Sequence, residues 1–142
     1  MATVSSVMTA NPASCTAQTP LRDVARMMID NDCGQIPVVD DARRPIGVIT
    51  DRDIAVRVVA QGRDSNAACA SDAMSSPVRT VNADCSIKDV VCAMEADKVR
   101  RLPVVDSDGR LAGIVSIADL ALAGKDEATA EVVKEVSERT KH

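Results

Sequence analysis

The chain has 142 residues, of which 46% are hydrophobic and 27% charged, and its formal net charge is −4. This composition is typical of a folded globular protein and excludes intrinsic disorder, and the length suits one compact domain or two half-sized ones that share a core. Acidic and basic residues are interspersed along both halves, and Phe, Trp and Tyr are absent, so neither a basic surface nor a stacking platform for nucleic acid is expected.

Membrane association and metal binding are not expected either. No apolar run approaches the roughly 18 residues of a membrane span, and the N-terminus lacks the basic and apolar regions of a signal peptide, so we expect a cytoplasmic protein. The single histidine is the last residue, and no two cysteines have C-x-x-C spacing. No metal site is therefore predicted. In a reducing compartment the cysteines would be small buried hydrophobes, with Cys33 the candidate if one thiol senses stress.

The first predicted helix follows Thr19 and Pro20. Thr19 is expected as its N-cap and Pro20 at its first position, and one apolar face is expected at Leu21, Val24, Ala25 and Met28. Two short apolar strands follow, at residues 35–40 and 45–49, and the turn composition of the connector between them predicts a hairpin.

A second helix is expected to begin at Thr50 and to end near Gly62. A polar connection then spans residues 61–72, with a helical turn expected within 66–72. Beyond residue 124, the segment Lys125–His142 is predicted to be a charged amphipathic helix that covers an apolar edge, with one apolar side formed by Ala128, Val132, Val133 and Val136.

The pattern between these ends occurs twice, 66 positions apart, with no insertion or deletion between Met8 and Ala121. Each copy is too large for a solenoid repeat, and two copies are too few for one. We therefore expect two similar modules, residues 1–65 and 66–124, related by an approximate two-fold axis. The matching segments are Ile36–Asp40 with Leu102–Asp106, Gly47–Thr50 with Gly113–Ser116, and Asp53–Ile54 with Asp119–Leu120.

Catalytic motifs are missing from the sequence. There is no G-x-G-x-x-G, no Walker A loop, and no histidine placed to act as a general base. We therefore predict that the protein is not an enzyme and has no catalytic residue.

The candidate binding residues lie at the two strand-to-helix junctions, Thr50–Asp53 and Ser116–Asp119. A hydroxyl followed three residues later by a carboxylate is close to a capping box, which starts a helix without any further function. The same geometry offers free backbone N–H groups to a phosphate, and the carboxylate could accept from a ribose diol. Arg52 adds positive charge to the first junction only, because Ala118 occupies the matching position. Two copies, each after a hairpin strand, favour a site.

The loops before the first hairpin strands supply further candidates. Val99, Arg100 and Arg101 precede one strand, and arginines there are either solvated or offer bidentate phosphate contacts. The matching residues Cys33, Gly34 and Gln35 carry no charge, so the two clefts are expected to be unequal. Each cleft could combine a junction with a loop from either module.

The ordered set of repeated motifs resembles the CBS domain, the module named after cystathionine β-synthase, in tandem as a Bateman pair. The resemblance rests on Met8-Thr9 and Met74-Ser75, the two P-V-V-D strands, and Gly47–Ile54 with its twin at 113–120. It covers residues 4–124 and is strongest to small stand-alone bacterial pairs, such as the mycobacterial hypoxic response proteins.

The resemblance implies an α/β fold of two β-α-β-β-α units packed sheet to sheet with pseudo-two-fold symmetry, often assembled as homodimers. It implies no required cofactor but an adenine nucleotide as ligand, AMP or ATP first, then ADP, NAD or S-adenosylmethionine. The nucleotide-binding residues that it implies are Thr50, Asp53, Ser116, Asp119, Cys33, Gly34, Gln35, Val99, Arg100 and Arg101. Arg52 is added to them for its charge, and Ile36 as an aliphatic contact for the base.

Without aromatic rings, the adenine would lie between aliphatic side chains such as Ile36, Val48, Leu102 and Ile114. The function expected is a non-enzymatic regulatory module that binds the nucleotide in clefts between the CBS units and signals through a conformational or assembly change. Its output would pass through an unidentified protein partner or through the assembly state itself. Two alternatives remain: a CBS pair that docks on a partner with its clefts empty, and a thiol-based stress sensor.

Overall fold

The structure, a computed structural model, describes residues 2–123, which form two compact units. The first-repeat unit is Ala13–Val78. The second-repeat unit joins residues 2–12 to residues 79–123. The predicted amphipathic helix at Lys125–His142 lies outside the described residues.

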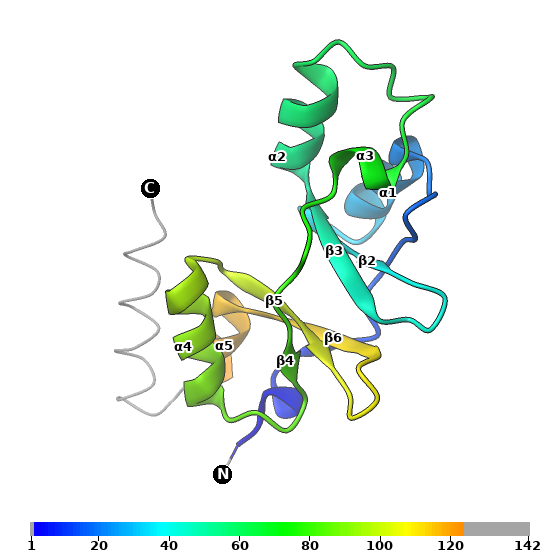
Figure 1. Ribbon diagram of the computed structural model, residues 1–142. Coiled ribbons are helices and arrows are strands. Elements are labelled where there is room, and N and C mark those ends of the chain that lie inside the picture. Colours follow the sequence, from blue (N-terminus) through cyan, green and yellow to red (C-terminus); the bar gives the residue numbers. More distant parts are fainter. Residues whose placement is uncertain (1, 124–142) are drawn as a thin grey trace. The chain divides into compact units, whose positions relative to one another are not determined.

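Both units have the mixed α/β composition predicted from the sequence (Figure 1). The elements of the first-repeat unit are α1 (Leu21–Asp30), β2 (Gln35–Val39), β3 (Pro45–Thr50), α2 (Asp51–Ile54), the π-helical turn η2 (Ala55–Val59) and α3 (Ala70–Ala73). Those of the second-repeat unit are the 3₁₀ turn η1 (Val4–Ser6), β1 (Thr9–Ala10), β4 (Val81–Asn82), α4 (Ile87–Asp97), β5 (Arg101–Val105), β6 (Leu111–Ser116) and α5 (Ile117–Ala123).

Each unit is built around an antiparallel hairpin, β2–β3 in one and β5–β6 in the other. The tip of the first is shaped by Asp40, whose Oδ1 accepts from the backbone N–H groups of Ala42 and Arg44, both at 2.9 Å. Asp106 repeats this turn in the second hairpin, at 2.9 and 3.0 Å. An aspartate that binds its own following backbone is a standard turn former, and the predicted hairpins are confirmed.

The short segment in front of each repeat adds to the hairpin of the other repeat. In the second-repeat unit β1 pairs with β6, so that Thr9 lies opposite Ile114, and the full sheet order is β1-β6-β5-β4. In the first-repeat unit Ser75 bridges Val48 in the same antiparallel sense. The two repeats thus exchange their leading segments, which the sequence analysis did not foresee.

Close packing of these segments depends on glycine. A Cβ on Gly113 would lie 2.8 Å from the carbonyl oxygen of Thr9, and one on Gly47 would lie 2.8 Å from that of Ser75. No other residue lets the exchanged backbone approach so closely.

The cores consist of aliphatic side chains at matching positions of the repeats. Val24, Ile36, Val38 and Ile49 are at most 1% exposed in one unit, and Val90, Leu102, Val104 and Val115 at most 2% in the other. In the second-repeat unit α4 and α5 lie side by side over the sheet (Figure 1), and Met94 and Leu120 are fully buried there.

Two local predictions are corrected by the structure. Thr19 does not cap α1; Pro20 is the N-cap, and the Thr19 hydroxyl instead accepts from the N–H of Thr16 at 3.0 Å. The second helix of the first repeat is not α-helical throughout, because it continues from Ile54 as the π-helical turn η2. The helical turn expected within 66–72 forms slightly later, as α3.

We predict that Gly113→Ala and Gly47→Ala each destabilise the fold by about 1–3 kcal/mol, because the new methyl group overlaps the carbonyl of the exchanged segment. Gly62→Ala is the control: its φ of +70° costs about 1 kcal/mol, yet no atom lies within 4 Å of the added Cβ. Chemical denaturation measures the loss, and limited proteolysis should show easier cleavage near Thr9 in Gly113→Ala only. Equal protection of that segment in all variants would contradict this packing role.

Candidate functional site at the strand-to-helix junctions

In the first-repeat unit, Thr50 and Asp53 form a complete capping box at the start of α2. The Thr50 Oγ1 accepts from the N–H of Asp53 at 3.0 Å, and the N–H of Thr50 donates to the Asp53 Oδ2 at 2.9 Å. The extended backbone of Thr50 (φ −103°, ψ 162°) lets its side chain turn back onto the helix. The predicted capping geometry is confirmed here.

The second-repeat unit repeats this arrangement at Ser116 and Asp119. The Ser116 Oγ accepts from the N–H of Asp119 at 3.1 Å, and the N–H of Ser116 donates to the Asp119 Oδ2 at 3.0 Å. All four side chains are half-buried. Both helix starts are therefore rigid, and both keep a polar face accessible to solvent.

Capping does not use up the hydrogen-bonding capacity of these side chains. A hydroxyl that accepts one bond still has its own hydrogen to donate, and a carboxylate has two oxygens. Among residues 2–123, Oδ1 of Asp53 and of Asp119 accepts no hydrogen bond. Each junction can therefore present one hydroxyl donor and one carboxylate acceptor to a ligand while the cap stays intact.

The loops predicted to take part in binding lie beside these junctions. The N–H of Asp51 donates to the carbonyl of Gly34 at 3.0 Å, and the N–H of Ile117 donates to the carbonyl of Arg100 at 2.9 Å. The hairpin register also places Gln35 opposite Thr50 and Arg101 opposite Ser116. Within each unit, loop and junction thus meet: Cys33, Gly34 and Gln35 with Thr50–Asp53, and Val99, Arg100 and Arg101 with Ser116–Asp119.

The two junctions differ in charge at matching positions. In the first-repeat unit the carboxylate of Asp51 lies over Gly34, where a Cβ would be 3.0 Å from Oδ2. In the second-repeat unit Ile117 replaces Asp51 and Arg100 replaces Gly34, while Arg101 is exposed. The loop beside the second junction therefore carries positive charge. The loop beside the first junction has no charged residue and lies next to the Asp51 carboxylate.

The aliphatic residues named for the adenine ring divide into two groups. Ile36 and Leu102 are 1% and 2% exposed and belong to the cores. Val48 and Ile114 are half-buried beside the exchanged segments, opposite Ser75 and Thr9. An apolar contact for a base is therefore more accessible at Val48 and Ile114.

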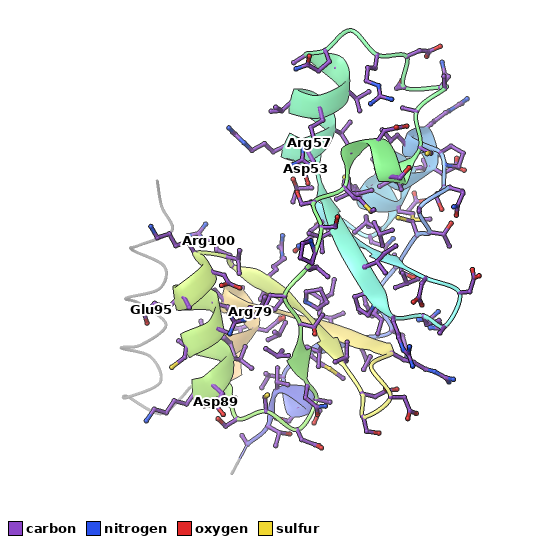
Figure 2. All side chains as sticks on the ribbon, viewed as in Figure 1. Asp53, Arg57, Arg79, Asp89, Glu95 and Arg100 are labelled. Carbon is purple, nitrogen blue, oxygen red and sulfur yellow. The ribbon has the colours of Figure 1, made fainter. Side chains whose placement is uncertain are left out.

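Arg57 is a residue that the sequence analysis missed. Its Nη1 donates to the carbonyl oxygens of Ala73, at 2.9 Å, and Met74, at 2.7 Å. Figure 2 labels it on the helical segment formed by α2 and η2, which also carries Asp53. The only signal in the sequence was its spacing of four residues from Asp53, which places both side chains on one helix face.

A second arginine holds the same connecting segment. The Arg63 Nη2 lies 3.0 Å from the Asp72 Oδ1, and the N–H of Cys69 donates to the Asp72 Oδ2 at 2.8 Å. The backbone N–H of Cys69, followed by the Arg63 guanidinium, lowers the pKa of Asp72 from its usual value. Residues 69–75 are thus attached to the first-repeat unit through Arg57 and Arg63.

Cys15 and Cys33 of the first-repeat unit lie in different surroundings. Cys15 is buried, and burial raises the pKa of its thiol to about 11, so it stays protonated at neutral pH. Cys33 is half-buried, and its Sγ lies 3.6 Å from the carbonyl of Gln35. Within residues 2–123 no three His, Cys, Asp or Glu side chains gather where they could hold a metal ion. No helix of that part is both long and apolar enough to span a membrane.

Two repeated α/β units with matched strand-to-helix junctions define a tandem module, and the chain belongs to the CBS domain family. The family matches residues 4–60 and 70–126, which confirms the resemblance found in the sequence.

Similar proteins include small stand-alone members of this family. Hypoxic response protein 1 of Mycobacterium tuberculosis is 35% identical over 136 residues, covering 96% of this chain and 94% of that protein. A crystal structure of Hypoxic Response Protein I with two coordinated zinc ions has a TM-score of 0.78 at 34% identity, covering 85% of this chain and 98% of that one. The chain spans 50% of the length of MK0525 of Methanopyrus kandleri, at 39% identity over 98 residues, or 69% of this chain.

Two similar structures contain adenosine ligands. CBSX2 of Arabidopsis thaliana in complex with AMP has a TM-score of 0.74 at 25% identity, covering 87% of this chain and 96% of that one. The CBS domain pair of MJ0100, in complex with 5′-methylthioadenosine and S-adenosyl-L-methionine, has a TM-score of 0.77 at 25% identity, covering 89% and 99%. Two enzymes among the relatives are matched over only 24% and 20% of their own lengths.

We predict that Ser116→Ala costs about 1 kcal/mol of stability by removing the cap of α5. Ser86→Ala is a matched control, because the Ser86 Oγ caps α4 by accepting from the N–H of Asp89 at the same 3.1 Å. Thermal or urea denaturation should give similar losses for both variants, and Ser116→Thr should restore the stability. A loss in Ser86→Ala alone would show that the Ser116 cap does not contribute.

Proposed function

We propose that this protein is a non-enzymatic regulatory module that binds an adenine nucleotide at its strand-to-helix junctions. The observation that carries the proposal is the paired capping box beside a loop, present at the same positions of both units. A capping box can start a helix without a neighbouring loop. Here the hairpin register and one backbone hydrogen bond hold the loop before the hairpin next to each capping box.

Each group has a role that its chemistry suits. The hydroxyls of Thr50 and Ser116 donate to phosphate oxygens, and Oδ1 of Asp53 and Asp119 accepts from the ribose hydroxyls. The arginines beside the second junction, Arg100 and Arg101, add charge-assisted contacts to phosphate, and the half-buried Val48 and Ile114 contact the adenine ring.

Relatives support the ligand class. CBSX2 binds AMP, and the CBS pair of MJ0100 binds S-adenosylmethionine and methylthioadenosine. An adenosine moiety is common to these ligands, so the proposal commits to adenosine-containing ligands, with AMP or ATP first. Binding would act by favouring one arrangement of the protein over another.

Isothermal titration with AMP, ATP, NAD and S-adenosylmethionine tests the proposal. We expect micromolar to millimolar binding of at least one, and at least a tenfold loss in the double variant Asp53→Ala/Asp119→Ala, since each lost charged hydrogen bond is worth about 1.5–3 kcal/mol. Ser86→Ala, which loses a cap of the same kind far from either junction in sequence, should bind like the unmodified protein.

Absence of heat and of any thermal shift with all four ligands at millimolar concentration would reject nucleotide binding. The remaining hypothesis would then be an interaction module that docks on a partner protein with its junctions empty.

We further propose that the protein is a homodimer that associates through the second helices of the repeats. Val56 and Leu122 occupy matching positions and are 47% and 82% exposed, and Val59, one turn after Val56, is 67% exposed. Exposed apolar side chains at matching positions of a duplicated chain suit a symmetric interface.

The expected result is a dimer by light scattering for the unmodified protein and a monomer for Val56→Glu/Val59→Glu, because a charge buried in an apolar interface is costly. Ile29→Glu is the control, since Ile29 is 70% exposed on α1 and lies outside the proposed interface. A monomer in every case, or a dimer that survives the double substitution, would contradict this interface.

A further inference from the structure

The first-repeat unit contains an oriented arginine with part of its guanidinium still available. Arg57 lies in η2, and its Nη1 donates to two carbonyl oxygens, those of Ala73 and Met74, at 2.9 and 2.7 Å. Two hydrogen bonds from one nitrogen fix the plane of the guanidinium, because this group is rigid.

The other edge of the same group has N–H donors that no described residue accepts from. A guanidinium has five N–H donors, and within residues 2–123 the two on Nη1 are the ones used. Nε and Nη2 of Arg57 form no hydrogen bond to residues 2–123, and no described carboxylate forms an ion pair with this arginine. Within that part of the chain, the positive charge is thus held in place without an ion-pair partner.

The position of Arg57 relates it to the first junction. Asp53 and Arg57 are four residues apart on the same helical segment, so their side chains lie on one face, and Figure 2 labels both on the segment formed by α2 and η2. The carbonyls that Arg57 holds directly precede Ser75, which bridges Val48 on β3, two residues before Thr50. The guanidinium therefore lies among elements that meet at the capping box.

If Arg57 only attached residues 69–75 to the helix, these features would not all be needed. Arg63 already attaches the same connecting segment through Asp72, and that arginine has its charge matched by a carboxylate. The π-helical turn that carries Arg57 is a rare local geometry that often occurs at functional sites. The second repeat has Ala123 at the matching position and carries its loop charge on Arg100 and Arg101 instead.

We propose that Arg57 is a further phosphate-binding residue of the first-repeat site, beside the Thr50 hydroxyl, presenting Nε and Nη2 to a ligand phosphate while Nη1 stays on the carbonyls of Ala73 and Met74. This inference rests on the proposed nucleotide-binding function and assigns a ligand class to one of its two sites. The first-repeat site then selects a phosphorylated adenosine over adenosine itself, although its loop carries no basic residue. A planar fork with two parallel donors matches phosphate oxygens.

The test compares AMP with adenosine by isothermal titration, in a background that carries Asp119→Ala so that the first-repeat site is observed. We expect Arg57→Gln to weaken AMP binding about tenfold to hundredfold and to leave adenosine binding within about twofold, because only the charged hydrogen bonds are lost. Arg57→Lys keeps the charge but not the fork, and should weaken AMP by a smaller factor, again without changing adenosine.

Arg63→Gln is the matched structural control. It also removes an arginine that attaches residues 69–75, so it should lower the melting temperature while leaving the ratio of AMP to adenosine affinity unchanged. If Arg57→Gln does not fold, the ratio of AMP to adenosine affinity in Arg57→Lys still tests the inference.

Three outcomes would overturn the inference. An equal loss for AMP and adenosine in both Arg57 variants would assign Arg57 a structural role. An unchanged AMP affinity would remove it from the site. Loss of all binding in the Asp119→Ala background, when the unmodified protein binds AMP, would mean that the first-repeat site holds no nucleotide. Failure of the proposed function itself is distinct from these, since the unmodified protein would then bind neither ligand.

Discussion

In each unit, one backbone hydrogen bond closes the geometry on which the candidate site depends. The first N–H of the second helix donates to a carbonyl in the loop before the hairpin, from Asp51 to Gly34 and from Ile117 to Arg100. An unpaired N–H at a helix start needs a partner, and here the loop supplies it. The fold therefore holds the loop and the capping box together in each unit.

The duplication gives two such junctions, and they differ in their side chains. The backbone frame is common to both units, from the hairpin register to the capping boxes. The charges on that frame differ between the repeats. The positions of Arg52 and Arg57 correspond to Ala118 and Ala123 in the second repeat, and that of Gly34 corresponds to Arg100. If both junctions bind the proposed ligand, a difference in preference between them would come mainly from these side chains.

Most local structure was predictable, because its causes lie within a few residues. Apolar alternation and turn chemistry located the hairpins, and the hydroxyl and carboxylate at Thr50 and Asp53 located a helix start. Thr19 shows the limit of that approach, since a nearby N–H, that of Thr16, competed for its hydroxyl and Pro20 took the cap. Arg57 was missed because its partners are backbone carbonyls 16 and 17 residues away. Every residue has such a carbonyl, so the sequence does not show which one an arginine will bind.

The amino-acid sequence by itself determined the duplicated α/β fold, the family, and the two junctions with their neighbouring loops. Only the tertiary structure decided that the repeats exchange their leading segments, so that Thr9 pairs with Ile114 and Ser75 with Val48. The physical reason is the duplication itself. Both hairpin edges carry a glycine, Gly47 and Gly113, that admits a neighbouring backbone, so either edge could accept either segment, and local sequence does not distinguish them. Which leading segment pairs with which hairpin edge is decided by the path of the whole chain.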